Sequence, residues 1–245
     1  MKNIDVLWEG NLLLYNINWN ARNVVKCNYF QEYEHEAKKN WSLHIKKHPN
    51  DYDGTLLFLE NFSFKDNQLD LEISLFKFSM ANYLLKQKIP LSKGYGALGT
   101  QYLVFSPKKD HILVGQRAKT QSYYPRAINV PGGILEVDDP ANAPAATLTR
   151  ELREEVILPL NSNFNLVAIL GGWDNVSVTL LISTTIQKMN FDPIETYPSD
   201  NYEWESNLRW LSLKTLEKMP STNFLDGLTY FQSKLIEKTR SSIKG

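Results

Sequence analysis

The stretch Val130–Leu160, VPGGILEVDDPANAPAATLTRELREEVILPL, guides the interpretation of the whole chain. It opens with Pro-Gly-Gly and continues into a helix-like run that places Glu151, Glu154 and Glu155 within five positions. Glutamates three and four residues apart share one flank of a helix, so this spacing predicts three carboxylates close together. The stretch therefore predicts either a metal site or a solvated acidic helix face.

The same run predicts which side of the helix is buried. At about 100° per residue, Leu148, Leu152 and Val156 form an apolar stripe beside the acidic flank. Like charges at this spacing destabilise a helix by roughly 0.2–0.5 kcal/mol per pair. A divalent cation such as Mg²⁺ or Mn²⁺ reverses that sign, because hard ions prefer clustered carboxylate oxygens. The alternative is a solvated face on which Arg150 and Arg153 pair with the glutamates.

The remaining chain predicts two domains of mixed secondary structure. Residues 1–95 are predicted to form strand, helix, strand, strand and helix, with a hairpin that joins LLFLENFSF to the alternating strand LDLEISL. The proline and glycines between residues 90 and 99 predict a boundary, so we expect an N-terminal α+β domain (1–95) and a second domain (96–245). The second part is strand-rich without regular βαβ alternation, which indicates the α+β class.

Composition narrows the class of protein further. The 245 residues are 42% hydrophobic, and 27 basic residues balance 27 acidic ones, so charge gives no reason to expect nucleic acid or a membrane as partner. Cys27 is the only cysteine, which excludes an internal disulfide and favours a reducing compartment. Because the first residues lack the apolar core of a secretory signal, we expect a cytoplasmic protein.

The glutamate run and the glycines together resemble the signature of the Nudix hydrolase family. That signature is Gly, five residues, Glu, seven residues, then Arg-Glu-aliphatic-x-Glu-Glu-x-Gly-aliphatic. Gly133 matches the first glycine and RELREE, residues 150–155, matches the core. Three departures occur: Asp139 replaces the first Glu, the gap that follows is three residues longer, and Ile157 replaces the last glycine. The resemblance covers roughly residues 98–240 and implies an α/β/α sandwich with a mixed sheet.

The resemblance also implies roles for individual residues. The three glutamates of the run, Glu151, Glu154 and Glu155, are expected to bind Mg²⁺ or Mn²⁺ ions that bridge a diphosphate. Arg150 is expected to orient them, paired with Asp139 or, in a different threading of the loop, with Glu136. Gly132 and Gly133 would let the backbone approach the helix and the metal closely. Glu205 is the candidate for a general base or additional ligand, although an acid before a strand can also be merely solubilising.

Candidate substrate-binding residues lie on either side of the signature. Arg117 and Arg126 have the guanidinium shape that matches phosphate oxygens, but both are equally consistent with ordinary surface arginines. Asp174 and Asn175, in the segment GGWDN, have hydrogen-bonding ends suited to sugar hydroxyls, which turn chemistry explains equally well.

The histidines of the chain show no metal-binding pattern. His44 and His48 are four residues apart on the first expected helix, where we expect a solvated face rather than a zinc site.

A narrower resemblance concerns the substrate. The segment LREEVILPL, the long N-terminal region and the stretched loop are similar to a eukaryotic Nudix branch that hydrolyses UDP-glucose and UDP-galactose to UMP and a sugar 1-phosphate. This predicts a small-molecule nucleotide substrate, with an N-terminal domain that covers the base or forms a homodimer. Two alternatives remain: a Nudix hydrolase of ADP-ribose or a dinucleotide, and a catalytically silent nucleotide-binding module.

Overall fold

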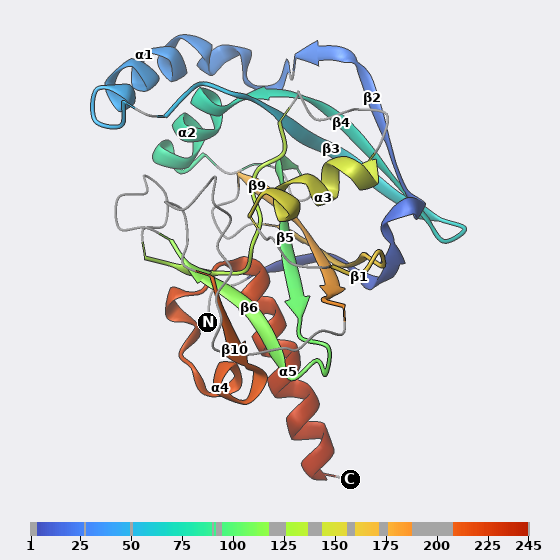
Figure 1. The fold of residues 1–245 in the computed structure, drawn as a ribbon. Coiled ribbons are helices and arrows are strands. Elements are labelled where there is room, and N and C mark those ends of the chain that lie inside the picture. Colours follow the sequence, from blue (N-terminus) through green and yellow to red (C-terminus); the bar gives the residue numbers. More distant parts are fainter. Residues whose placement is uncertain are drawn as a thin grey trace.

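The computed structural model describes most of the chain (Figure 1). The described residues are 4–26, 28–49, 51–89, 91, 95–117, 126–136, 144–155, 160–171, 176–187 and 208–244. Inside these ranges, the side chains of residues 20–29, 144, 146, 151, 154, 155, 223, 240 and 242–244 are outside the description.

The described strands form one mixed sheet of ten strands. The hydrogen-bonded path runs β1-β8-β9-β5-β3-β4-β2, and β6 joins β5, β7 and β10 beside it. The pairs β5–β9 and β2–β4 are parallel, and the other pairs between these strands are antiparallel. The strands are β1 (Asp5–Leu13), β2 (Ile17–Lys26), β3 (Thr55–Lys65), β4 (Gln68–Lys77), β5 (Gly96–Phe105), β6 (His111–Gln116), β7 (Ile128–Asn129), β8 (Asn165–Gly171), β9 (Ser177–Thr185) and β10 (Arg209–Ser212).

Helices cover both faces of this sheet, as the alternation of side chains along β5 shows. Tyr102 points into the core that contains the apolar residues of α3, whereas Leu103 points into the opposite core, which contains those of α4 and α5. Ala97 joins a third core, under α1 and α2. The helices are α1 (Glu34–Ile45), α2 (Phe78–Gln87), α3 (Pro144–Glu155), α4 (Leu213–Lys218) and α5 (Asp226–Lys244). The predicted α+β class, with a mixed sheet between helical layers, is therefore confirmed.

Strands from both sides of residue 95 belong to this one sheet. β1 pairs with β8, and β3 continues the sheet from β5 through Phe58 and Ala97. Lys234 on α5 also contacts Glu9 on β1, with Nζ 2.8 Å from Oε2, and this ion pair lowers the pKa of Glu9. The division into domains 1–95 and 96–245 stays a prediction, and any such domains share a continuous hydrogen-bonded sheet.

The N-terminal elements differ from expectation in two places. The first expected strand is in fact two strands, β1 and β2, separated by a 3-10 turn at Leu14–Asn16. The predicted hairpin of β3 and β4 is confirmed, with Asp66 and Asn67 at its turn in the left-handed conformation. Ser74, on the polar side of the alternating strand LDLEISL, is nevertheless buried, because its register partner Phe58 and its same-face neighbour Phe76 belong to the core under α1 and α2.

The helices of the described chain show no candidate for a membrane span: none is both long enough and apolar enough.

A buried hydrogen bond ties α3 to the centre of the sheet. The hydroxyl of Tyr102 on β5 donates to the backbone oxygen of Leu148 at 2.6 Å, and both side chains are fully buried. Leu148 and Leu152 pack into the same core as Tyr102. The bond therefore fixes where α3 crosses β5.

Removal of this hydroxyl should destabilise the protein measurably. We expect Tyr102→Phe to lower the free energy of unfolding by about 0.5–1.5 kcal/mol, because one buried hydrogen bond is removed. Urea denaturation followed by fluorescence measures this change. Tyr15→Phe, at a side chain that is 72% exposed, is the matched control and should lie within about 0.5 kcal/mol of the wild type. Equal stability of both variants would show that the bond contributes nothing.

Candidate functional site

The acidic run forms a helix, as predicted. α3 begins at Pro144, a residue favoured in the first turn of helices, and contains all of RELREE up to Glu155. Leu148 and Leu152 are completely buried, which confirms the predicted apolar stripe at those two positions. Val156 lies outside the described residues. The backbone therefore places positions 151, 154 and 155 on one flank, although their side chains are not described.

This acidic flank is continuous with a buried side of α3. Thr147 lies four positions before 151 and seven before 154, so the three positions follow one line along the helix. Thr147 is fully buried, whereas Arg153, on another side of α3, is exposed. One turn before the first glutamate, this line therefore packs against protein. A helix side that is exposed along its whole length would not bury Thr147, so this side of α3 lies against protein in its first turn.

The glycine segment, which we define as residues 131–135, is fixed on β5 by three backbone hydrogen bonds. The amides of Tyr102 and Thr100 donate to the oxygens of Pro131 and Gly133, both at 2.8 Å. The amide of Leu135 donates to the oxygen of Leu98 at 2.9 Å. The segment thus runs as an additional strand beside β5, on the edge opposite β9. Leu135 belongs to the same hydrophobic core as Leu148 and Leu152, so the segment and α3 border one core.

Gly132 is the position at which this segment requires glycine. Its φ is +149°, and an added Cβ would lie 2.1 Å from the oxygen of Thr100 and 2.9 Å from the Cα of Gln101. A second close approach involves Gly99, whose added Cβ would lie 3.1 Å from the oxygen of Gly133. The observed close approach is to β5. The predicted approach of Gly132 and Gly133 to a metal stays a prediction.

The backbones of the two candidate phosphate-binding arginines, Arg117 and Arg126, are hydrogen-bonded to each other. The amide of Arg126 donates to the oxygen of Arg117 at 3.2 Å, and the amide of Arg117 donates to the oxygen of Ala127 at 2.9 Å. Arg126 is exposed and left-handed, with φ 64°, whereas Arg117 is partly buried. The structure therefore brings both residues together where β6 meets β7. Their contact with phosphate stays a prediction.

Glu136 has a partner that the sequence did not suggest. The hydroxyl of Tyr52 donates to Oε1 of Glu136, across 84 positions of sequence. Glu136 also forms an isolated β-bridge with Leu56 at the start of β3. The N-terminal region therefore contacts the chain three residues after Gly133, at Glu136. Several other predicted site residues lie outside the described residues, namely Asp139, Asp174, Asn175 and Glu205.

The prediction of a solvated helix face around His44 is wrong. His44 is only 5% exposed, its Nε2 lies 2.7 Å from Oδ2 of Asp51, and its ring stacks between Trp41 and His48. Lys86 of α2 lies 3.3 Å from its Nδ1, and burial lowers the pKa of this lysine. A buried imidazole with polar partners at both nitrogens has a structural role, and the contact with Lys86 links α1 to α2. Among the described side chains, no group of three His, Cys, Asp or Glu residues forms a metal site.

Comparison with known proteins gives fold-level likenesses only. No family model and no curated protein matches the chain. Among solved structures, Tm1382 aligns over 80% of this chain and 95% of its own, at 13% identity and a TM-score of 0.45. The NUDIX domain of Shewanella oneidensis NrtR, complexed with ADP ribose, aligns over 60% of this chain and 88% of its own, at 19% identity and a TM-score of 0.41.

A third likeness is to a bifunctional NMN adenylyltransferase/ADP ribose pyrophosphatase from Francisella tularensis, complexed with AMP and a Mn ion. It covers 65% of this chain and 48% of that chain, at 18% identity and a TM-score of 0.43. All three identities are below a fifth and all three TM-scores are below 0.5. No conclusion about the activity of this chain rests on them.

The glycine segment gives a direct test of the site's architecture. We expect Gly132→Ala to destabilise the protein by about 1–3 kcal/mol or more, because the added Cβ meets backbone atoms and the φ is unfavourable for alanine. Thermal unfolding measures the loss. Gly171→Ala is the matched control: its nearest contact would be the Cβ of Asp5 at 3.2 Å, so its loss should be clearly smaller. A Gly132→Ala variant as stable as the wild type would contradict the structure of this segment.

Proposed function

We propose that this chain is a divalent-metal-dependent pyrophosphohydrolase of the Nudix type. The strongest supporting observation is that all of RELREE lies in α3. The buried leucines of this helix share a core with Tyr102 of β5 and with the glycine segment, which is hydrogen-bonded to β5. Such an arrangement of helix and glycine segment is what the sequence resemblance implies. The preferred substrate is a nucleoside diphosphate sugar with a uridine base, which would give UMP and a sugar 1-phosphate.

The donor set fits Mg²⁺ or Mn²⁺. Three carboxylates at i, i+3 and i+4, carried by Glu151, Glu154 and Glu155, are hard oxygen ligands of the kind these ions prefer. An ion held there would neutralise diphosphate oxygens and acidify a water molecule. A solvated helix gains nothing from this cluster, since like charges repel at these spacings. The helical backbone through position 155 makes the shared flank possible.

The remaining roles belong to residues of the chain itself. In the proposed reaction, a water oxygen bonds to one phosphorus, the bridging P–O bond breaks, and the leaving phosphate keeps the electron pair. Glu205 would take the proton of the water, and Arg150 would orient the glutamates. Arg117 and Arg126 would hold phosphate oxygens with their guanidinium groups. Their backbones are hydrogen-bonded to each other, so both side chains start from one place in the structure. Asp174 and Asn175 would bind sugar hydroxyls.

Two other functions use the same site. A hydrolase of ADP-ribose or of a dinucleotide would keep the chemistry and change the leaving group. A silent nucleotide-binding module is suggested by Asp139 and Ile157, which depart from the family signature. Retention of all three helix glutamates favours catalysis, because a pure binding module has no need of this repulsive cluster. We also propose a small-molecule nucleotide as the partner, with no role for nucleic acid.

Product analysis of a substrate panel separates these functions. Purified protein is incubated with UDP-glucose, UDP-galactose, ADP-ribose or NADH, with Mg²⁺ or with Mn²⁺, and the products are resolved by ion-exchange chromatography. The proposal predicts fastest release of UMP and sugar 1-phosphate from a UDP-sugar. Faster cleavage of ADP-ribose or NADH than of the UDP-sugars would show that the substrate is ADP-ribose or a dinucleotide instead. Turnover of no compound at high protein concentration would support the silent module.

Substitution of one glutamate tests its catalytic role. We expect Glu155→Gln to lower turnover by about a hundredfold or more, because a ligand that supports several kcal/mol of transition-state stabilisation is lost. Circular dichroism should show an unchanged fold. Glu237→Gln is the control, since that acid lies on α5 and is 68% exposed, and it should keep near-normal turnover. Near-normal rates for Glu155→Gln would count against the metal assignment.

A further inference from the structure

An asparagine just before the glycine segment has a buried oxygen that lacks a hydrogen bond. Asn129, the last residue of β7, is only partly buried as a residue, yet its Oδ1 is shielded from solvent and has no hydrogen-bond partner in the part of the chain that the structure describes. A buried polar atom without a partner lowers the stability of a folded protein. A carboxamide oxygen can only accept, so this atom needs a donor that a ligand could supply.

The register of the strands places Asn129 on the face of the sheet that carries α3. Asn129 pairs with Gly115 of β6, and paired residues of antiparallel strands point to the same side. Gly115 is two residues after Leu113, which lies in the core that contains the leucines of α3. The neighbours of Asn129 in the chain, Ile128 and Val130, pack in the opposite core. Both comparisons therefore give the same side for Asn129.

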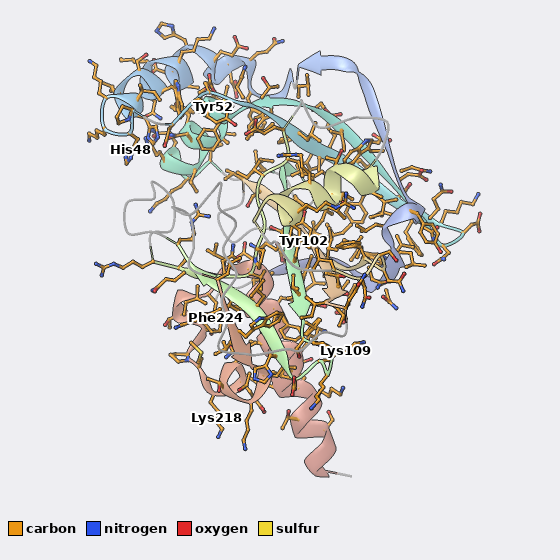
Figure 2. All side chains as sticks on the ribbon, in the orientation of Figure 1. His48, Tyr52, Tyr102, Lys109, Lys218 and Phe224 are labelled. Carbon is orange, nitrogen blue, oxygen red and sulfur yellow. The ribbon has the colours of Figure 1, made fainter. Side chains whose placement is uncertain are left out.

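This face leads from Asn129 to the acidic positions of α3. Pro131 follows Asn129 by two residues, which is at most about 7 Å along the chain. The oxygen of Pro131 accepts from the amide of Tyr102, whose hydroxyl donates to the oxygen of Leu148. Figure 2 shows Tyr102 beside α3. Glu151 comes three positions after Leu148, a rise of about 4.5 Å. A ligand held at the acidic positions can therefore extend toward Asn129 without leaving this side of the sheet.

Arg117 lies on the same face, next to Asn129. It is two residues after Gly115, and its amide donates to the oxygen of Ala127, two residues before Asn129, so alternation directs both side chains to the side of α3. Their chemistry differs. The guanidinium of Arg117 matches phosphate oxygens, whereas phosphate oxygens are acceptors and do not satisfy Oδ1 of Asn129. The carboxamide instead matches a planar group that presents an N–H beside a carbonyl oxygen.

We propose that Asn129 is a substrate-binding residue whose carboxamide recognises the edge of the nucleobase. The proposal rests on the proposed function, which supplies a nucleotide with a uridine base. The N3–H of uracil donates to Oδ1 of Asn129, and Nδ2 of Asn129 donates to a neighbouring carbonyl oxygen of the base. A pair of hydrogen bonds between an amide side chain and a base contributes about five- to a hundredfold to discrimination between ligands. Arg117 then lies beside the base site, where it can hold a phosphate of the same nucleotide.

The variant Asn129→Leu separates a binding role from a structural one. Leucine is similar in size to asparagine and removes both polar atoms of the carboxamide. If Asn129 serves binding, the variant should unfold at the same or a higher temperature than the wild type, because the cost of the buried oxygen is removed. A clearly lower unfolding temperature would overturn the proposal, since it would show that the carboxamide stabilises the fold. Asn18→Leu, at an exposed asparagine of β2, is the control and should change neither the unfolding temperature nor the affinity for nucleotide.

A methylated nucleotide identifies the base edge as the contact. Equilibrium dialysis compares UMP with N3-methyl-UMP, with EDTA present so that no metal-dependent hydrolysis occurs. We expect the wild type to bind UMP about five- to a hundredfold more tightly than N3-methyl-UMP, and Asn129→Leu to bind both with the same weak affinity. Unchanged affinity of Asn129→Leu for UMP would overturn the proposal. An equal loss of affinity for both nucleotides would also overturn it, because it would indicate a contact with ribose or phosphate instead.

These measurements are independent of turnover. If the wild type hydrolyses UDP-sugars while Asn129→Leu keeps its affinity for UMP, the proposed function stands and base recognition by Asn129 fails. If the wild type hydrolyses nothing but its binding of UMP requires Asn129 and the N3–H, base recognition stands and the proposed catalysis fails. A wild type that does not bind UMP at millimolar concentration overturns base recognition in either case.

Discussion

The backbone hydrogen bonds between the glycine segment and β5 are the constraint on which the site depends. They fix the residues from Pro131 to Leu135 as an additional strand, and Gly132 permits this because an added Cβ would overlap the oxygen of Thr100. Leu135 then contributes to the core that receives Leu148 of α3. The placement of the acidic helix therefore depends on the Tyr102–Leu148 hydrogen bond and on the core that Leu135 shares with Leu148 and Leu152.

The N-terminal region belongs to the same construction. β1 lies at one end of the sheet against β8, and β3 continues the sheet beyond β5. Because the sheet is continuous, residues far apart in sequence, such as Tyr52 and Glu136, meet beside the glycine segment. An N-terminal part joined in this way can supply binding groups with fixed geometry. A tethered domain that moves independently would supply them only after an ordering step, which lowers affinity.

Local patterns in the sequence predicted the elements better than the contacts between them. α3 was predictable because Leu148 and Leu152 repeat at helical spacing beside the glutamates, and the hairpin was predictable because side chains alternate along β4. The burial of His44 was missed because its two polar partners, Asp51 and Lys86, lie outside its own helix. The contact of Tyr52 with Glu136 leaves no local signal, since two chain segments 84 positions apart create it. Glu205 was predicted only from its place before an expected strand, and residue spacing does not determine the geometry of such a connection.

Whether the acidic flank of α3 binds a divalent ion is the question that separates an enzyme from a surface helix. Titration of the substrate-free protein with Mn²⁺, with free ion followed by electron paramagnetic resonance, answers it directly. The prediction is saturable loss of the free Mn²⁺ signal at millimolar ion with the wild type, and no such loss when Glu151, Glu154 and Glu155 are all replaced by Gln. A wild-type titration that is indistinguishable from that of the triple variant would contradict the metal site, and with it the proposed chemistry.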